Sequence, residues 1–498
     1  MLRLIRSIKN SLAPINQFPP EVFSLIPDYY YEDDTDRDLI SLTHVCRGWR
    51  NTLISCSPLW TRLDFMNIDK TRTYIQRSRS SPLKLNLEFD EDINDSFPLM
   101  IPHVHRLKSL TIRTYPLPSV LDNFRFRTPL LEKLDIQINT IDEVIPDSAL
   151  FDGDLPSLRN LRLSGFFTHF PWKNLANLQA VRLEHSFRPY QTTQILDLFD
   201  SAPLLRAVFL RYPMPDSSDA PPGRMVTLPH LKLFIIDAVP PQSTLLRHLQ
   251  IPIGASLISE FCFHGQECPL LDYIPETPPN LNNLSHITTI HLFLSSGSKC
   301  VRLSGPSGSL QVYASPVCCE APFSYAIDCH ILQSFGPTML SKIQRLIVSA
   351  HLPHQKWVGE CPIFQTLSSM NNLRTLALVN CDTLPFILAL DPKQNLSNPV
   401  LCSNMEELVL HISSYDFSFK PIVNMAKNRA SRGAKLSSIV IVSPASLWSS
   451  WKGIPELSDH ITHLEHRDGN HTPAWDDVPE EWRSEGRYEE IFDAGICA

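Results

Sequence analysis

Apolar residues recur along the chain with one fixed spacing, in which an apolar residue is followed by two more at the third and fifth positions after it. This L-x-x-L-x-L phrase begins at twelve places, and the residues in it are called its three anchors. The first anchors are Leu107, Leu131, Leu158, Leu178, Leu205, Leu231, Ile258, Ile287, Ile343, Leu373, Met405 and Leu436. Alternate strand residues point to the same face, so the last two anchors read as a short strand and the first as a turn residue before it.

The spacing of the phrases predicts how the strands are connected. Successive first anchors are 24, 27, 20, 27, 26, 27, 29, 56, 30, 32 and 31 residues apart. A period in this range leaves room for a return segment after each strand, and residues 191–199 and 421–432 are expected to be return helices. The interval of 56 residues spans about two periods, which predicts a degenerate repeat within residues 300–330, on residues 309–313. We therefore expect an α/β leucine-rich-repeat solenoid of about 12 to 13 irregular repeats over residues 106–466, with parallel strands on its concave face.

Proline use agrees with this organisation. The chain has 42 prolines and only 16 glycines in 498 residues, the reverse of ordinary usage. Pro129, Pro156, Pro203 and Pro229 each stand two residues before a first anchor. Proline there would end a return helix and favour an extended backbone, so it marks the boundaries between repeats.

The residue between the second and third anchors of each phrase points to the opposite face of its strand. In chain order these residues are Thr111, Asp135, Arg162, Arg182, Phe209, Ile235, Cys262, His291, Ile347, Ala377, Val409 and Val440. We call them the inter-anchor row. Its first third is polar, with Arg113 and Arg211 flanking the two arginines, and its second half is largely apolar.

Two interpretations of the inter-anchor row remain open. A long exposed apolar strip would mark a protein-binding surface, since monomers rarely leave such patches bare. Alternatively, loops or the C-terminal tail cover it and only the arginine-bearing third is open. The candidate target-binding residues are Arg113, Arg162, Arg182, Phe209, Arg211, Ile235 and His291.

Residues 15–62 precede the repeats and predict a small helical module. Pro20 and Glu21 suit the first turn of a helix that ends at Pro27. Apolar residues at helical steps over residues 39–49 predict two more short helices, broken near residues 47–48. Three short helices bury little apolar area alone, so the module needs a partner or the rest of its own chain.

Four short segments of this module stand in a set order: FPPEV at 18–22, LISL at 39–42, VCRGW at 45–49 and SPLW at 57–60. Together they resemble an F-box, in the form common in basidiomycete fungi. Phe18 stands where this family usually has Leu, and the loop after the first helix is long. The resemblance implies docking on the adaptor subunit of Skp-cullin-F-box ubiquitin ligases. It implies that the following residues face this subunit or hold the helices that do: Pro20, Glu21, Val22, Leu39, Leu42, Val45, Cys46 and Trp49.

We therefore expect a non-catalytic substrate-recognition adaptor, in which the F-box-like module binds the ligase and the repeats bind a target protein. The alternative is a leucine-rich-repeat scaffold without a ligase link, whose N-terminal helices only cap the repeats. An enzyme with a dispersed active site is a third class. No GxxxxGK[ST], GxGxxG or GxSxG motif occurs, and His460, His463 and His466 do not converge on a strand or a helix, so no cofactor, metal site or catalytic residue is predicted.

Charge and composition bear on the compartment. The net charge of −8 argues against nucleic-acid binding, and −6 of it lies in residues 474–498, within an acidic aromatic tail (467–498) that either closes the solenoid or is disordered. No apolar run is long enough to span a membrane.

The 12 cysteines have no regular spacing, which favours the cytoplasm or nucleus. Residues 1–14 are read as a basic lead-in, with a mitochondrial presequence as the alternative, and residues 63–105 as a connector and N-terminal cap.

Overall fold

The fold is that of a computed structural model, in which the chain divides into two compact units, Met1–Arg188 and Pro189–Ala498. The residues that the structure describes are 12–14, 22, 38–65, 67–89, 97–114, 124–138, 150–165, 175–184, 191–211, 223–237, 243–263, 281–284, 286–294, 299–306, 308–316, 335–350, 363–393, 400–412, 417–448 and 454–469. The basic lead-in up to residue 11 and the acidic tail from residue 470 lie outside them.

The first unit combines short helices with parallel strands. Its helices are α3 (Asp38–Thr43), α4 (Arg47–Ser55) and α5 (Ile68–Ser78), and its 3-10 segments are η2 (Ser57–Trp60), η4 (Phe97–Leu99), η5 (Ile101–Arg106) and η6 (Leu150–Gly153). Its strands are β1 (Arg62–Leu63), β2 (Leu83–Phe89), β3 (Leu107–Thr114), β4 (Lys133–Ile138), β5 (Asn160–Ser164) and β6 (Ala180–Glu184). Each strand from β1 to β5 pairs in parallel with the next one along the chain. The sheet thus includes β1 and β2, which precede residue 106, where the sequence placed the first repeat.

The second unit holds the longer array. Its strands are β7 (Ala207–Arg211), β8 (Val226–Thr227), β9 (Leu233–Asp237), β10 (Leu249–Gln250), β11 (Ser256–Phe263), β12 (Thr289–Leu294), β13 (Lys299–Ser304), β14 (Ser309–Pro316), β15 (Arg345–Ala350), β16 (Thr375–Val379), β17 (Glu407–His411), β18 (Ser438–Ser443) and β19 (His463–Asp468). Its helices are α7 (Thr192–Asp200), α8 (Ser243–Arg247), η8 (Asn282–Leu284), α10 (Gly336–Leu340), α11 (Ile363–Ser369), α12 (Leu384–Leu390), α13 (Lys420–Ser431), α14 (Ala445–Trp448) and α15 (Ile454–Ser458). The helices predicted at 191–199 and 421–432 are confirmed as α7 and α13.

The sheet of the second unit is mostly parallel, with one antiparallel insertion. Strands β7, β9, β11 and β14 pair in parallel in that order, and so do β12, β15, β16, β17, β18 and β19. Between the two groups β13 pairs antiparallel with both β14 and β12. Strands β8 and β10 form a separate parallel pair. Residues 309–313, where a degenerate repeat was predicted, do form part of strand β14. This strand, however, is one arm of the antiparallel hairpin made by β13 and β14.

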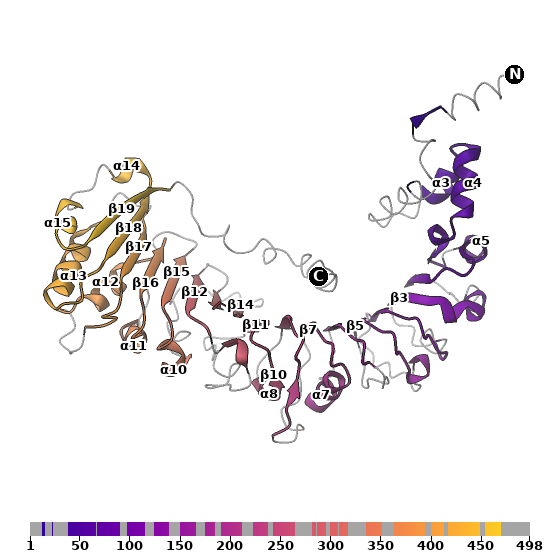
Figure 1. The fold of residues 1–498 in the computed structure, drawn as a ribbon, viewed down its shortest axis with the longest axis horizontal. Helices are drawn as coiled ribbons and strands as arrows, with labels where there is room; N and C mark the ends of the chain where they lie inside the picture. The colour runs from indigo at the N-terminus through magenta and orange to yellow at the C-terminus, as the bar shows by residue number, and fades with distance from the viewer. Residues whose placement is uncertain are drawn as a thin grey trace. The chain divides into compact units, whose positions relative to one another are not determined.

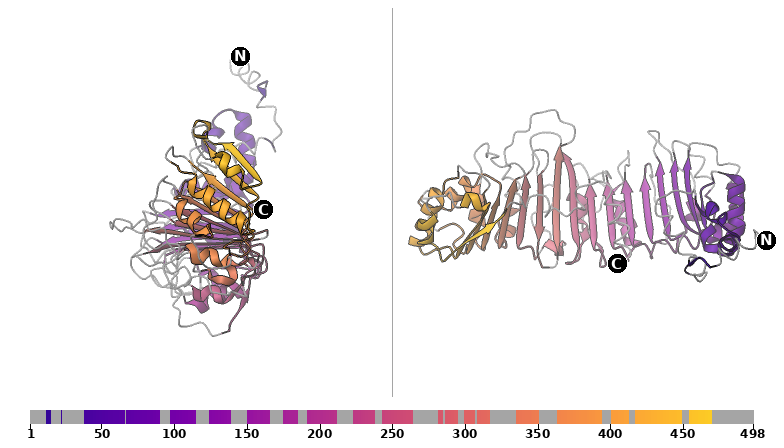
Figure 2. Two further views of the ribbon diagram at one scale, coloured as in Figure 1. Left: turned by 90° about the vertical axis from the view of Figure 1, so that its left-hand side faces the viewer. Right: turned by 90° about the horizontal axis from the view of Figure 1, so that it is seen from above.

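The anchors form the core of both units. In eleven of the twelve phrases all three anchors are buried. Successive helices cover this face: α10 packs on α11, α11 on α12 and α12 on α13, in a row beside strands β15 to β18 (Figures 1 and 2). Helix α13 contributes Ile422, Met425 and Ala426 to the layer between helices and strands. Both units therefore have a mixed α/β architecture with one face of the strands packed.

The phrase at Ile258 is the exception, and its predicted phase is wrong. Leu257 of β11 stands beside the anchor Phe234, and Ile258 stands beside Ile235 of the inter-anchor row. With Leu257 as its second anchor, the phrase begins at residue 254, so its predicted start at Ile258 is four residues too late. Leu257 and Ile258 are both buried, so the apolar pattern alone does not distinguish the two phases.

A β-turn before several of the strands explains the prolines. The backbone N–H of the first anchor donates to the carbonyl three residues earlier, as in Leu131 to Thr128, Leu158 to Leu155 and Leu205 to Ala202. Proline occupies the second turn position, where its fixed φ is already suitable. Side chains at the third position tie neighbouring turns together: Asn177 Nδ2 donates to the Pro156 carbonyl (2.8 Å), and Asn404 Nδ2 to that of Asn371 (3.0 Å).

Candidate functional site

Three regions are candidates for function: the inter-anchor row, the helical pair α3 and α4, and a basic pocket beside them. The inter-anchor row is neither a continuous exposed strip nor wholly covered. Arg182, Phe209, Ile235 and Val440 are buried, whereas Thr111, Arg162, His291, Ile347, Ala377 and Val409 are half-buried. The side chain of Cys262 lies outside the described residues. The half-buried apolar part is therefore short and centred on Ile347, Ala377 and Val409, which stand side by side on β15, β16 and β17.

The arginine-bearing third of the row is a buried charge network in the first unit. Arg182 Nη2 lies 2.6 Å from Glu184 Oε1, and Arg162 Nη2 lies 3.0 Å from Glu184 Oε2. Burial opposes ionisation of Glu184, but the hydrogen bond and charge of Arg182, together with Arg162, outweigh it and lower the pKa of Glu184. Burial raises the pKa of Asp135, which stands beside Arg162 on β4, and Arg162 and a hydrogen bond from Gln137 partly offset this.

This network corrects the expectation that Arg162 and Arg182 form an open basic face. The side chain of Arg182 is only 6% exposed, and Glu184 stands two residues further on the same face of β6. The sequence contained this signal, since residues i and i+2 of a strand share a face. Arg113 is exposed and Arg211 is half-buried, so the accessible positive charge is smaller than predicted.

Two other positions of the row have specific partners in the second unit. Phe209 and Ile235 form a buried apolar cluster with Ile258, against which Leu233 packs. His291 Nε2 lies 2.8 Å from Ser349 Oγ, and burial, aided by the charge of Arg302, lowers the pKa of His291 to about 4. His291 is therefore neutral at pH 7.

Helices α3 and α4 form a packed corner in the first unit. They break at residues 44–46, slightly before the predicted break, and Arg50 Nε closes the corner by donating to the Thr43 carbonyl (2.9 Å). Cys46 is the N-cap of α4, and its Sγ accepts from the Trp49 backbone N–H. Leu39 and Trp49 are buried, so among the F-box-like positions these two hold the corner together.

The same corner exposes apolar side chains. Val45 is 58% exposed and Ile40 is 43% exposed, and Leu42 is half-buried. Val22 is also exposed, whereas Pro20 and Glu21 lie outside the described residues. Apolar residues this exposed lose contact with water only when a partner covers them.

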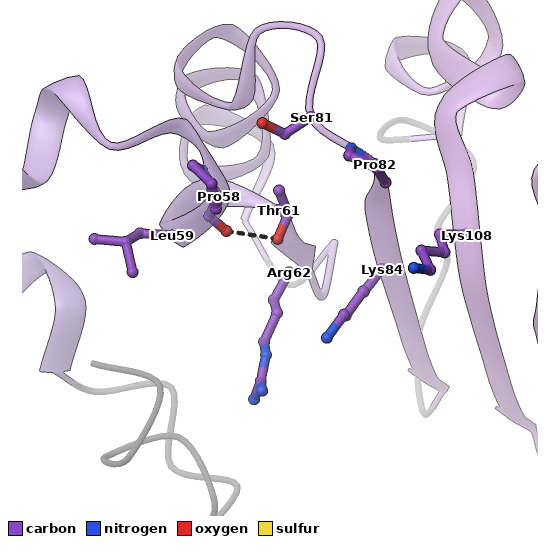
Figure 3. A pocket seen from close by; sticks show the side chains of 8 residues that line it. All are labelled: Pro58, Leu59, Thr61, Arg62, Ser81, Pro82, Lys84 and Lys108. Carbon is purple, nitrogen blue, oxygen red and sulfur yellow. Dashed lines mark hydrogen bonds between the residues drawn. The ribbon is translucent and has the colours of Figure 1, made fainter. Parts of the chain in front are cut away.

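A basic pocket of about 260 Å³ opens where the helical segment meets the first strands. It is lined by Pro58, Leu59, Thr61, Arg62, Ser81, Pro82, Lys84 and Lys108 (Figure 3). Arg62 and Lys84 are direct partners on β1 and β2. Lys108 stands at the start of β3. The register shifts at this point, because Leu83 and Lys84 of β2 stand beside Leu107 and Ser109 of β3. The sequence interpretation assigned residues 63–105 to a connector and missed this convergence.

Trp60 holds η2 in place, and η2 contributes Pro58 and Leu59 to the lining of the pocket. Its indole N–H donates to the Leu53 carbonyl (2.8 Å), its ring meets Tyr74 edge-on and Arg77 lies over its face. This fastens η2 between α4 and α5. Two further bonds set the floor: Thr61 Oγ1 donates to the Pro58 carbonyl (2.7 Å), and the Lys84 N–H donates to the Thr61 carbonyl (2.9 Å).

Within the described part of the chain, no three His, Cys, Asp or Glu side chains are grouped as a metal ion would need. His463 is exposed, and His466 stacks on Trp448 and bonds to the Ser443 carbonyl (3.0 Å). No helix among the described residues is long and apolar enough to span a bilayer.

The chain matches no protein-family model, and no curated protein is similar enough in sequence to count as a relative. Among the described residues, the exposed corner of α3 and α4 and the half-buried apolar part of the inter-anchor row are the candidate surfaces for protein binding.

Proposed function

We propose that the protein is a non-catalytic substrate-recognition adaptor of a Skp-cullin-F-box type ubiquitin ligase. The helical segment 15–62 docks on the adaptor subunit of the ligase, and the strand array, read as an irregular leucine-rich-repeat solenoid, binds a target protein. No chemical step is performed by this chain. Such an adaptor acts in the cytoplasm or nucleus, which agrees with the irregular use of cysteine.

The exposed apolar corner of α3 and α4 is the observation that carries the proposal. It lies in the segment whose order of residues resembles an F-box. Leu39 and Trp49 stabilise the corner from inside, while Val45 and Ile40 offer apolar area to a partner. Interfaces gain most of their binding energy from a few such anchors that become fully buried.

The strand array supports the target-binding role. Parallel strands follow one another in chain order with return segments between them, as in a repeat solenoid, apart from the hairpin at β13 and β14. Ile347, Ala377 and Val409 present adjacent half-buried side chains on three of these strands. A target would meet an apolar surface there, whereas Arg162 and Arg182 are already ion-paired with Glu184 within the chain.

Co-purification with the adaptor subunit tests the proposal. We expect the intact chain to retain the adaptor, and the double variant Ile40→Asp, Val45→Asp to lose it, because each carboxylate would be buried without a partner. Leu39 is unsuitable for this test, since it is buried and its substitution would unfold α3. Ile68→Asp is the matched control, because Ile68 is 38% exposed on α5, outside the corner.

The outcomes separate the two candidate functions. Retention by the intact chain and by Ile68→Asp, with loss by the double variant, supports the ligase adaptor. If the intact folded chain binds no adaptor, the scaffold without a ligase link is the better account. If the double variant binds as tightly as the intact chain, docking does not use this corner.

A further inference from the structure

Helices α12 and α13 of the second unit carry an exposed apolar pair beside exposed positive charge. Leu384 and Leu388 stand one turn apart on α12 and are 45% and 41% exposed. Lys420 and Lys427 are exposed on α13, which packs on α12 (Figure 1). We call these four residues the outer helix face. Apolar side chains paired in this way lose contact with water only when another segment covers them.

One hydrogen bond shows how the two helices are aligned. Asn428 Nδ2 of α13 donates to Oδ1 of Asp391, the C-cap of α12 (2.9 Å). Both helices connect parallel strands of one sheet, so they run in the same direction. Asp391 stands seven residues after Leu384, and Asn428 stands eight residues after Lys420. The first turns of the two helices, with Leu384 and Lys420, therefore lie at the same level.

The charge of the outer helix face is positive. Helices α11, α12 and α13 contain no acidic residue. Of the nearest acids, Asp382 accepts a hydrogen bond from the backbone at the start of α12, and Asp391 is buried. Neither Lys420 nor Lys427 has an ion-pair partner in the part of the chain that the structure describes. A segment that covers this face therefore binds best if it carries acids beside its apolar side chains.

We propose that residues 474–498 of the same chain dock on the outer helix face. This tail has eight acidic residues and two arginines, a net charge of −6. Its apolar side chains are interleaved with the acids, and Tyr488 and Phe492 have the same four-residue spacing as the two leucines of α12. One exposed ion pair contributes little alone, so apolar contact and several charges act together.

The tail begins close to this face. Strands β16, β17, β18 and β19 are parallel neighbours in that order, so their carboxyl ends lie at one edge of the sheet. Helices α12 and α13 follow β16 and β17 from this edge, and the chain leaves it after β19 at Asp468. The distance from β16 to β19 is about 15 Å, at the usual spacing of strands. Residues 470–482 span up to about 40 Å when extended, so the tail reaches the face within its own unit.

Zero-length cross-linking of the full-length protein tests this docking. A water-soluble carbodiimide activates a carboxyl group, and a lysine amine in contact with it attacks the carbonyl carbon. The carbodiimide leaves as a urea, and an amide bond joins the two side chains. We expect mass spectrometry to find Lys420 or Lys427 joined to an acid of the tail, in the monomer and independently of protein concentration. Added salt should lower the yield, because exposed charges are screened.

Two double variants connect the cross-link to the proposed contact. Leu384→Asp, Leu388→Asp should lower its yield about tenfold or more, because apolar contact is lost and the new charges repel the tail. Tyr488→Ser, Phe492→Ser should also lower the yield, because it removes apolar side chains and keeps every acid of the tail. Ile253→Asp is the matched control, since Ile253 is 42% exposed in the same unit, outside α12 and α13.

Thermal melting shows whether each variant is folded, and the tail variant changes no residue of the helices or strands described above. Loss of the cross-link in both double variants, with retention in Ile253→Asp, supports the proposal. It is overturned if the intact chain forms no cross-link between the tail and the face, or if both folded double variants cross-link as Ile253→Asp does. Cross-links confined to covalent dimers also overturn it, since the face then binds the tail of a second copy.

Discussion

Arg182 Nη2 donates to Glu184 Oε1 across 2.6 Å, and the two side chains are only 6% and 4% exposed. Arg162 reaches the other oxygen of the same carboxylate from the neighbouring strand, at 3.0 Å. One buried acid thus compensates two arginines that looked, in the sequence, like a basic surface. This part of the first unit is stabilised by charge, and it offers little free charge to a partner.

Glu184→Gln tests this network. Removing the acid leaves buried positive charge uncompensated, and breaking a buried ion pair in this way typically costs about 3 to 5 kcal/mol. We expect a loss of about 3 kcal/mol in the free energy of unfolding, measured with urea at pH 7. Glu132→Gln, which removes an exposed partner of Lys108, should cost less than about 1 kcal/mol. Equal effects of the two substitutions would contradict the buried network.

The burial of His291 predicts that the stability of the fold depends on pH. The folded protein holds the pKa of His291 at about 4, below the ordinary value of 6.5. Between these values the unfolded chain binds more protons, so stability is fully present above pH 6.5 and is lost as the pH falls through 4. The shift corresponds to about 3 kcal/mol.

His291→Gln should remove this contribution while keeping a hydrogen-bonding group beside Ser349. We expect the difference in unfolding free energy between the intact chain and the variant to change by about 3 kcal/mol from pH 7 to below pH 4. Urea unfolding at several pH values measures it. A difference that stays constant with pH would show that His291 titrates normally in the folded protein.

Shortening side chains of the inter-anchor row to alanine should lower the free energy of unfolding by different amounts at buried and at half-buried positions. Ile235 is buried between Phe209 and Ile258, so Ile235→Ala should lower the unfolding free energy by about 2 to 4 kcal/mol. Val409 is half-buried, and Val409→Ala should cost less than about 1 kcal/mol. Chemical denaturation of the two variants compares them. Similar costs would mean that the region around Val409 is covered as fully as the cluster at Ile235.

The hydrogen bonds of Arg429 hold helix α13 against the turn before β17. Its Nη1 and Nη2 donate to the carbonyls of Leu401 (2.7 Å) and Cys402 (2.8 Å), in the turn before β17, and the side chain is buried. Arg429→Met leaves both carbonyls without these donors and should cost about 2 kcal/mol or more. Lys427→Met, at an exposed position of α13, is the control and should change stability by less than about 0.5 kcal/mol. A loss no larger than that of the control would contradict this role.

The strands could be predicted because their anchors are buried in a fixed spacing. Leu373, Leu376 and Leu378 illustrate this, since all three are fully buried and their period is that of a turn followed by a strand. The prediction failed at Ile258, where apolar residues occupy both faces of β11 and the period no longer specifies the phase. The prediction also missed the hairpin of β13 and β14. Its turn contains Gly305 and Gly308, and the Gly305 N–H donates to the Gly308 carbonyl (3.0 Å). These two glycines were a signal for the turn in the sequence.

The candidate sites were less predictable than the strands. Whether an arginine is open or paired depends on residues brought in from other strands, as Glu184 and Arg162 show. The basic pocket needed the pairing of Arg62 with Lys84, which are 22 residues apart and have no periodic relation. Such long-range neighbours follow from the fold, and no local pattern contains them.

The most direct test of the ligase-adaptor role is reconstitution of the intact chain with the purified adaptor subunit. Size-exclusion chromatography with light scattering measures the mass of the species formed. The proposal predicts a single complex of one chain with one adaptor, lost in the Ile40→Asp, Val45→Asp variant and kept in Ile68→Asp. Separate elution of the intact folded chain and the adaptor would contradict it.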